Sequence, residues 1–225
     1  MSILKRHREA FGWTIKDIKG ISPAIVQHRI HLTDEAIPRR DPQCRLNPLM
    51  QEAIKMEFLK ILDNVIIPIS DSQWVSPVHT VPKKAGFTVV ENEQKKLVQT
   101  RLPTKVRVCI DYRKLNPTTR KDHFLLSFID QMIERLVGHE YCYFLDGYSG
   151  YNQILIAAED QEKTTFTCPF GTFAYRCMPF GLCNDPATFQ RCMLNCSPTW
   201  WNIFLRFLWM TSPSTEIHLI NIFII

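Results

Sequence analysis

The 225-residue sequence predicts an α+β fold, in which one mixed or antiparallel sheet carries helices on one face. Residues 49–62 have the apolar spacing of a helix, whereas residues 74–82 and 106–112 have the composition of strands. The helical and strand-like segments alternate without the regular order of βαβ units, which argues against a purely parallel sheet. With 45% apolar and 22% charged residues, the chain has the composition of a globular protein with one sizeable core or two small ones.

The first 48 residues are rich in charge and contain four prolines, at positions 23, 38, 42 and 48. Proline disfavours helix at the residue before it, so this segment is predicted to be an extended N-terminal connector. It is expected to lie over the folded body or to tether it to neighbouring domains. Its first ten residues are basic and polar and supply no secretory signal, which predicts a cytosolic or nuclear protein.

An amphipathic helix is expected over residues 49–62, with Ile54 and Phe58 on its apolar side, and a turn follows at Pro68. The strands at 74–82 and 106–112 are predicted to pair as a hairpin. Their connection is polar and basic, and it is expected to be mobile.

Helical periodicity over residues 128–137 ends at Gly138, because glycine readily takes the left-handed conformation that ends helices. An apolar strand follows at residues 141–145. Shorter runs predict the remaining elements, which are two strands at 154–156 and 163–167 and a helix at 186–193 that has Pro186 in its first turn.

The net charge of +5 and the pI near 8.8 favour a polyanionic partner, although many proteins without such a partner reach this charge. The eight cysteines form no Cys-x-x-Cys pair and no zinc-finger spacing with histidine, which predicts free thiols in a reducing compartment. The most apolar stretch, residues 217–225, is too short to span a membrane, so no membrane association is expected.

The residues best suited to catalysis or metal binding lie around an aspartate at the end of the apolar strand. Asp146 follows Phe144 and Leu145, which suits a metal ligand held at the edge of a sheet. An aspartate that merely begins a turn before Gly147 explains the pattern as well. Tyr151 offers a flat wall for a sugar ring, but an aromatic side chain near a strand end also fits a core position.

Two further groups carry weaker signals. Phe180 and Gly181 precede the proline-started helix, where a glycine lets the backbone approach a base pair or phosphate; a plain loop-to-helix junction fits equally well. Basic residues surround the predicted hairpin and suit triphosphate oxygens, or they form only a solvated face. They are Lys83, Lys84, Arg107 and Arg113.

Taken together, these motifs have a specific order and spacing. The matching segments are Trp74 to Pro77, Cys109 to Asn116, Phe144 to Gln153, Thr164 to Gly171 and Met178 to Arg191. In these segments the chain resembles the reverse transcriptases of gypsy-type long-terminal-repeat retrotransposons, particularly those of plants. The resemblance runs from about residue 4 to residue 193. It implies a partial right-hand polymerase, with fingers and an incomplete palm.

The resemblance implies a role for each candidate residue. Asp146 would be a catalytic carboxylate that binds Mg²⁺, and Tyr151 would exclude the wrong sugar. Lys83 and Arg107 would hold the incoming triphosphate, with Arg113 as a further nucleotide-binding candidate beside them. Phe180 and Gly181 would lie along the nucleotide and the template. The implied partners are an RNA or DNA template-primer and deoxynucleoside triphosphates.

The resemblance also divides the chain. It implies an N-terminal connector at 1–48, fingers at 49–127, a palm segment at 128–156, a second fingers segment at 157–183, the start of a palm helix at 184–196, and a tail outside the family at 197–225. Four residues depart from the family pattern, namely Val106, Leu125, Ser127 and Asp185. Asp185 replaces a usual alanine, and its added negative charge is expected to weaken nucleotide binding.

The tail differs from the rest of the chain in composition. From Ser197 onward only Arg206 and Glu216 are charged, and three of the five tryptophans fall there. The family continues here to a hairpin that carries Met-Asp-Asp and the other two catalytic carboxylates. Codons for Phe-Met-Asp-Asp-Phe, read one base late, spell Leu-Trp-Met-Thr-Ser, which is the sequence of residues 208–212.

This correspondence predicts a one-base frameshift between Met193 and Ser197; the alternatives are an unrelated replacement and a mis-spliced exon. Without the hairpin, the palm is expected to lack carboxylates and to expose a sheet edge. The sequence therefore predicts a fragment of an RNA-directed DNA polymerase domain that is catalytically inactive. The alternatives are a non-catalytic nucleic-acid-binding remnant and an unstable pseudogene product.

Overall fold

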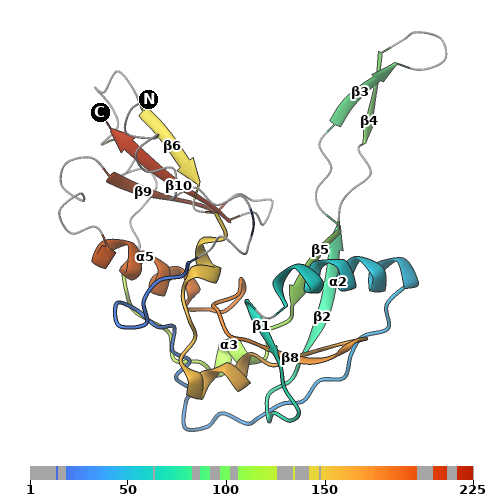
Figure 1. Cartoon of the computed structure of the whole chain (residues 1–225), viewed down its shortest axis with the longest axis vertical. Helices are drawn as coiled ribbons and strands as arrows, with labels where there is room; N and C mark the ends of the chain where they lie inside the picture. Colours follow the sequence, from blue (N-terminus) through green and yellow to red (C-terminus); the bar gives the residue numbers. More distant parts are fainter. Residues whose placement is uncertain are drawn as a thin grey trace.

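The computed structural model describes residues 19–62, 64–82, 87–91, 97–101, 106–125, 142–146, 148–196, 205–211 and 217–224, together with Thr14 and Glu134. Within these residues the strands form sheets of five, three and two strands. Figure 1 shows the five-stranded sheet in the lower body, with the three-stranded sheet above one side and the two-stranded hairpin projecting from the other. The predicted α+β class is confirmed.

The five-stranded sheet is mixed. Its strand order is β1 (Ile66–Pro68), β8 (Gly171–Tyr175), β7 (Phe166–Cys168), β2 (Ser76–Pro82) and β5 (Val106–Ile110). Strands β2 and β7 are parallel, and the other neighbours are antiparallel. The expected hairpin partners are β2 and β5, with Val78 opposite Ile110.

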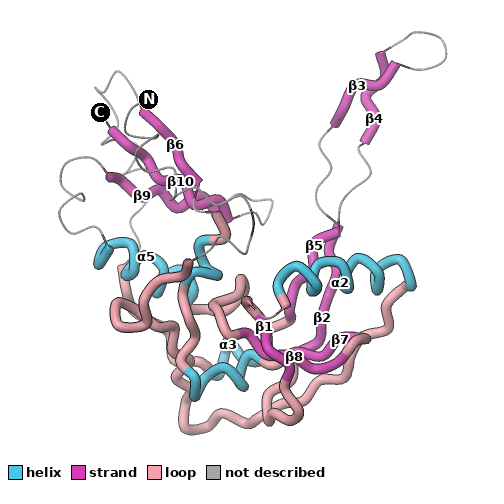
Figure 2. The backbone as a smooth tube through the Cα atoms, in the orientation of Figure 1, coloured by secondary structure: helices cyan, strands magenta, loops and turns pink. Residues whose placement is uncertain are grey.

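Helix α2 (Pro48–Ile61) packs against this sheet, as the apolar spacing over 49–62 predicts. Asn47 caps it, because its side chain accepts the N–H of Leu49. Ile54 and Phe58 are buried, and the Phe58 ring lies 5.2 Å from the ring of Phe166 on β7. Figure 2 shows the helix lying across the strands that it covers.

Residues 19–47 run over the body as extended chain. The His28 N–H donates to Leu155 O, and the Ala157 N–H donates to His28 O, each at 2.9 Å. Further along, the Val75 N–H donates to Arg39 O at 2.9 Å. These backbone hydrogen bonds hold the segment on two parts of the body that lie far apart in sequence.

The connection between β2 and β5 differs from the expectation. It contains a hairpin of its own, β3 (Phe87–Glu91) paired with β4 (Leu97–Arg101), which Figure 1 shows standing clear of the body. The reason is local, since both strands contain β-favouring residues such as Val89 and Val98. The segment between β2 and β5 is polar overall, so its composition does not predict the two short strands.

Two other expected elements also differ. Residues 154–156 form isolated bridges, His28 with Ile156 and Leu155 with Cys177, instead of a strand. A 3-10 helix, η4 (Ala158–Thr164), occupies the start of the predicted strand at 163–167, and β7 begins only at Phe166. The helix expected at 128–137 lies outside the described residues except for Glu134.

The three-stranded sheet has the order β6 (Cys142–Asp146), β10 (Ile217–Ile224) and β9 (Leu205–Thr211). The tail therefore pairs with one edge of β6, while β6 and β9 remain the outer strands of this sheet among the described residues. The physical reason for the pairing is composition: β9 and β10 are rich in isoleucine, leucine and aromatic residues, which favour strands. No helix in the described part of the chain is long and apolar enough to cross a membrane.

Candidate active site

Asp146 is the last residue of β6, the position that the sequence predicts for it. Its partner across the ladder is Ile220 on β10. Its side chain lies outside the described part of the structure. The backbone after it enters a turn in which Ser149 has a φ of 45°, a left-handed conformation that is uncommon for a residue with a Cβ. The 3-10 helix η3 (Gly150–Gln153) follows directly and carries Tyr151.

Tyr151 is a buried aromatic residue, with only 1% of its surface exposed. Its ring lies 4.6 Å from that of Phe180 and 5.4 Å from that of Phe189. Burial, followed by the nearby Asp185, raises the pKa of the Tyr151 phenol above its ordinary value. Phe180 is half exposed. The solvent-facing aromatic surface at this point therefore belongs to Phe180, and Tyr151 supports it from beneath.

The loop that contains Phe180 and Gly181 is held by Asn116. The Asn116 side-chain amide donates to Gly181 O at 2.9 Å, and its oxygen accepts the N–H of Cys183 at 3.0 Å. Gly181 has a φ of 113°, which favours glycine, and a Cβ there would lie 3.6 Å from the Tyr112 ring. Sequence reasoning did not single out Asn116, although it ends the motif that begins at Cys109.

Arg113, a nucleotide-binding candidate, is already engaged. Its Nε and Nη2 donate to the two carboxylate oxygens of Asp111 at 2.8 and 2.7 Å. These hydrogen bonds outweigh partial burial and lower the pKa of Asp111 to about 2. The Nε2 of His79 lies 3.3 Å from the same carboxylate. Arg113 is 84% exposed, so the pair lies at the surface and is worth little in stability.

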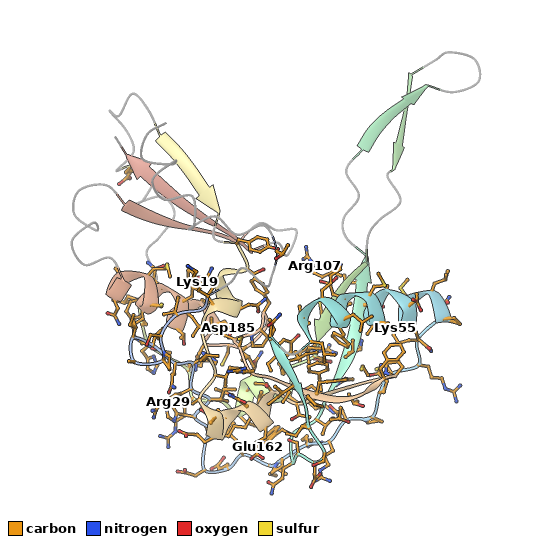
Figure 3. The ribbon with its side chains drawn as sticks, in the orientation of Figure 1. Lys19, Arg29, Lys55, Arg107, Glu162 and Asp185 are labelled. Carbon is orange, nitrogen blue, oxygen red and sulfur yellow. The ribbon has the colours of Figure 1, made fainter. Side chains whose placement is uncertain are left out.

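The two remaining basic candidates come from the same pair of strands. Arg107 lies on β5 opposite Val81 of β2, and Figure 3 shows it at the end of the sheet from which the β3–β4 hairpin departs. Lys83 follows directly after β2 and lies outside the described residues. The structure thus brings Phe180 and Gly181 together with Tyr151. Arg107 lies on β5 of the five-stranded sheet, and Arg113 lies three residues after the end of that strand.

Asp185 does not present its charge to a nucleotide, which corrects the expectation from sequence. It is 1% exposed at the first position of α5 (Asp185–Cys196), where its Oδ2 accepts the N–H of Leu182 at 2.9 Å. Its Oδ1 lies 3.7 Å from Nε2 of His28, whose Nδ1 is 3.0 Å from Oγ1 of Thr188. Burial raises the pKa of Asp185 well above its ordinary value and lowers that of His28 to about 4, so it favours the neutral form of both groups.

The described side chains do not by themselves make up a two-metal site, and the side chain of Asp146 is not among them. Such a site needs converging carboxylates, because Mg²⁺ takes oxygen ligands. In the described part of the chain, no group of three His, Cys, Asp or Glu side chains is placed to hold a metal ion. Strands β9 and β10 contain Arg206 and His218 but no carboxylate.

A strand-borne aspartate, a buried tyrosine after it and a glycine loop before a helix together define the class, which is a partial polymerase domain of the right-hand type. A family model described as reverse transcriptase (RNA-dependent DNA polymerase) matches residues 81–209. This match covers more than half of the chain, so the chain belongs to the reverse transcriptase family. The matched range ends within β9 and includes the first part of the tail.

Curated relatives are retrotransposon polyproteins. The Pol polyprotein of transposon 297 from Drosophila melanogaster is 32% identical over 170 residues, which is 76% of this chain and 15% of that protein. The corresponding protein of transposon gypsy, from the same organism, is 33% identical over 144 residues, covering 64% of this chain and 13% of the relative. An RNA-directed DNA polymerase homolog from Oenothera berteroana is 42% identical over 94 residues, covering 42% of this chain and 66% of the relative.

Solved structures agree on the fold. The foamy viral protease-reverse transcriptase in complex with an RNA/DNA hybrid superposes with a TM-score of 0.71 at 20% identity, over 99% of this chain and 26% of that one. The native prototype foamy virus enzyme gives a TM-score of 0.62 at 18% identity, over 100% and 27% of the two chains. This chain spans about a quarter of the length of those two structures.

Proposed function

We propose that this chain is a reverse transcriptase domain fragment that binds a nucleic-acid template-primer but does not transfer nucleotides. The observation that carries the proposal is the partner of Asp146: β10 places Ile220 opposite it, and neither described strand of the tail contains a carboxylate. A one-base frameshift would account for this replacement, because codons that spell Leu-Trp-Met-Thr-Ser at residues 208–212 can encode Phe-Met-Asp-Asp-Phe in another frame.

The chemical argument concerns charge. Two-metal nucleotidyl transfer needs several carboxylates to hold Mg²⁺ between the primer end and the triphosphate. Asp146 alone supplies one of them. Losing the others is expected to reduce the rate by orders of magnitude, since each 1.4 kcal/mol of lost transition-state stabilisation costs about tenfold. Glu216, the remaining acid of the tail, lies outside the described residues.

Nucleic-acid binding is supported by charge and by the relatives. The chain has a net charge of +5, and the solved relatives include foamy viral reverse transcriptase bound to an RNA/DNA hybrid and to double-stranded DNA. In our proposal Phe180 and Gly181 contact the template or nucleotide, with Tyr151 beneath them. Lys83, Arg107 and Arg113 provide positive charge for phosphates, and Arg113 must exchange Asp111 for a phosphate to do so.

Two measurements on the purified chain test this proposal. In a primer-extension assay with Mg²⁺ and all four deoxynucleoside triphosphates, we expect no product from the native chain and none from Asp146→Asn. In a binding assay with the same template-primer, we expect salt-sensitive binding by both proteins, because phosphate contacts release counterions. Primer extension by the native chain that disappears in Asp146→Asn contradicts the proposed lack of nucleotide transfer. Absence of binding at low salt contradicts the proposed binding of the template-primer.

A further inference from the structure

A basic pocket of about 420 Å³ lies on the body beside the start of helix α5. The N-terminal segment, residues 120–122 and helix α5 form its walls. In Figure 3 Arg29, which lines this pocket, is on the lower side of the body, whereas Arg107 points to the space beside the β3–β4 hairpin. None of the predicted site residues lines the pocket.

The N-terminal segment forms the first wall, because buried and exposed side chains alternate along it. His28 and Ile30 are buried, so the residues on either side of them, Gln27, Arg29 and His31, face outward into the pocket. The backbone is fixed at both buried positions. Leu155 O accepts the His28 N–H, and the Ile30 N–H donates to Oδ2 of the buried Asp160 at 2.8 Å. Arg29 therefore projects from an anchored backbone.

Residues 120–122 build the second wall, and Asn184 fixes them. The Arg120 N–H donates to His31 O at 2.8 Å, which joins this wall to the first. The Asn184 side-chain amide donates to Arg120 O at 2.8 Å, and its oxygen accepts the N–H of Asp122 at 3.0 Å. Lys121, between these two anchored residues, also lines the pocket.

Helix α5 and the residue before it form the third wall, with Asn184, Thr188 and Arg191 spaced at helical intervals. Arg191 is oriented before any ligand arrives. Its Nη2 donates to both oxygens of Asp122 at 2.8 and 2.7 Å, and its guanidinium lies 5.0 Å from the centre of the Phe124 ring. These hydrogen bonds use one nitrogen of Arg191, and the remaining donors of its planar fork suit oxyanions.

The pocket has excess positive charge. Arg29, Arg120, Lys121 and Arg191 line it, against the single carboxylate of Asp122. Arg120 has only a 3.8 Å contact with Asp34, which is 96% exposed. Within the described residues, the side chains of Arg29 and Lys121 have no hydrogen-bond or ion-pair partner. Arg29 and Lys121 thus remain unneutralised beside Arg191, which Asp122 holds in place, and Arg120, whose contact is weak.

We propose that this basic pocket binds phosphate groups of a nucleic-acid strand at a point separate from the candidate active site. The proposal rests on the proposed function, because the strand is part of the bound nucleic acid. The donors are arginine and lysine groups on three fixed walls around an open hollow, a pattern that recognises oxyanions without reading bases. Free phosphate shares this chemistry, so the test separates the two sources.

The test is the salt dependence of binding to a labelled single-stranded oligonucleotide. We expect Arg29→Gln/Lys121→Gln to weaken binding and to reduce the slope of log K against log salt by roughly 1.4, since each phosphate contact to a single strand contributes about 0.7. The charge-conserving variant Arg29→Lys/Lys121→Arg should keep the native slope. A matched control, Arg39→Gln/Lys55→Gln, removes one arginine and one lysine that do not line the pocket.

Each other outcome counts against the proposal. If the native chain binds and the pocket variant has the native slope, only the pocket assignment is overturned. If the control loses as much slope as the pocket variant, the effect is one of net charge and the pocket is not a site. If inorganic phosphate shifts the backbone amide signals of residues 29 and 121 while the pocket variant binds the oligonucleotide normally, the ligand is free phosphate. If the native chain binds no oligonucleotide, the proposed function fails as well.

Discussion

At the residue scale, the neighbours of each candidate side chain determine what that side chain can contact. Asp146 stands at a strand end and Gly181 has a positive φ, both as the motifs indicate. Tyr151 is buried rather than exposed, and Arg113 is paired with Asp111. Burial and pairing depend on neighbours from distant parts of the chain, which a single sequence does not specify.

Asp185 gives a prediction about stability and pH. Because its folded pKa is raised, the stability contributed by its protonated form is lost as pH rises from its unfolded value toward its folded value. His28 acts in the opposite sense: its folded pKa of about 4 lies below the unfolded 6.5, so stability is lost as pH falls through that window. The two effects oppose each other between about pH 4 and 6.5.

Replacing the acid removes one of these effects. Asp185→Asn keeps the acceptor for the Leu182 N–H, so we expect it to raise the free energy of unfolding at pH 7 by about 1–3 kcal/mol. Its stability should also fall more steeply than that of the native chain as pH drops from 6.5 to 4. Urea unfolding at several pH values measures both, with the exposed Asp34→Asn as control. A loss of stability at pH 7 in Asp185→Asn contradicts this account.

Asn116 gives a second prediction at this scale. Asn116→Ala removes two hydrogen bonds from the Phe180–Gly181 loop and leaves Gly181 O and the Cys183 N–H without that partner, so we expect a loss of about 1–3 kcal/mol. The same change at the exposed Gln73 should be near neutral. Equal effects of the two substitutions on the urea midpoint would show that Asn116 does not hold the loop.

At the element scale, long periodic segments are predicted well and short ones poorly. Helix α2 appears at the expected place because its apolar residues repeat over several turns. The strands β1 and β8 and the β3–β4 hairpin escape prediction, since each is at most five residues long and its partners are set by tertiary pairing. The tail strands β9 and β10 form because their apolar composition favours strands.

The packing of α2 gives a prediction with a control one residue away. Phe58 is 6% exposed and contacts the ring of Phe166, so Phe58→Ala should cost about 3–5 kcal/mol of unfolding free energy. Leu59 is 60% exposed on the same helix, and Leu59→Ala should change stability by less than about 0.5 kcal/mol. Urea unfolding compares the two variants. A similar cost for both would mean that α2 does not bury the face assigned here.

At the scale of the whole molecule, the fold of a reverse transcriptase domain is present, and the described strands of the tail add no carboxylate to it. The tail occupies the edge of β6 with β10, and the pairing supplies isoleucine where converging carboxylates are needed. In our proposal, this chain keeps the fold and lacks the chemistry. The backbone can be completed by any strand-forming sequence, whereas the reaction needs particular side chains at particular positions.

The most direct measurement compares the native chain with the chain encoded after a one-base correction between the codons for Met193 and Ser197. Both proteins are assayed for primer extension with Mg²⁺ on the same template-primer. We predict extension by the corrected chain, lost again in its Asp146→Asn variant, and none by the native chain. Extension by the native chain at a rate comparable to the corrected chain would contradict the central claim that the missing carboxylates abolish nucleotide transfer.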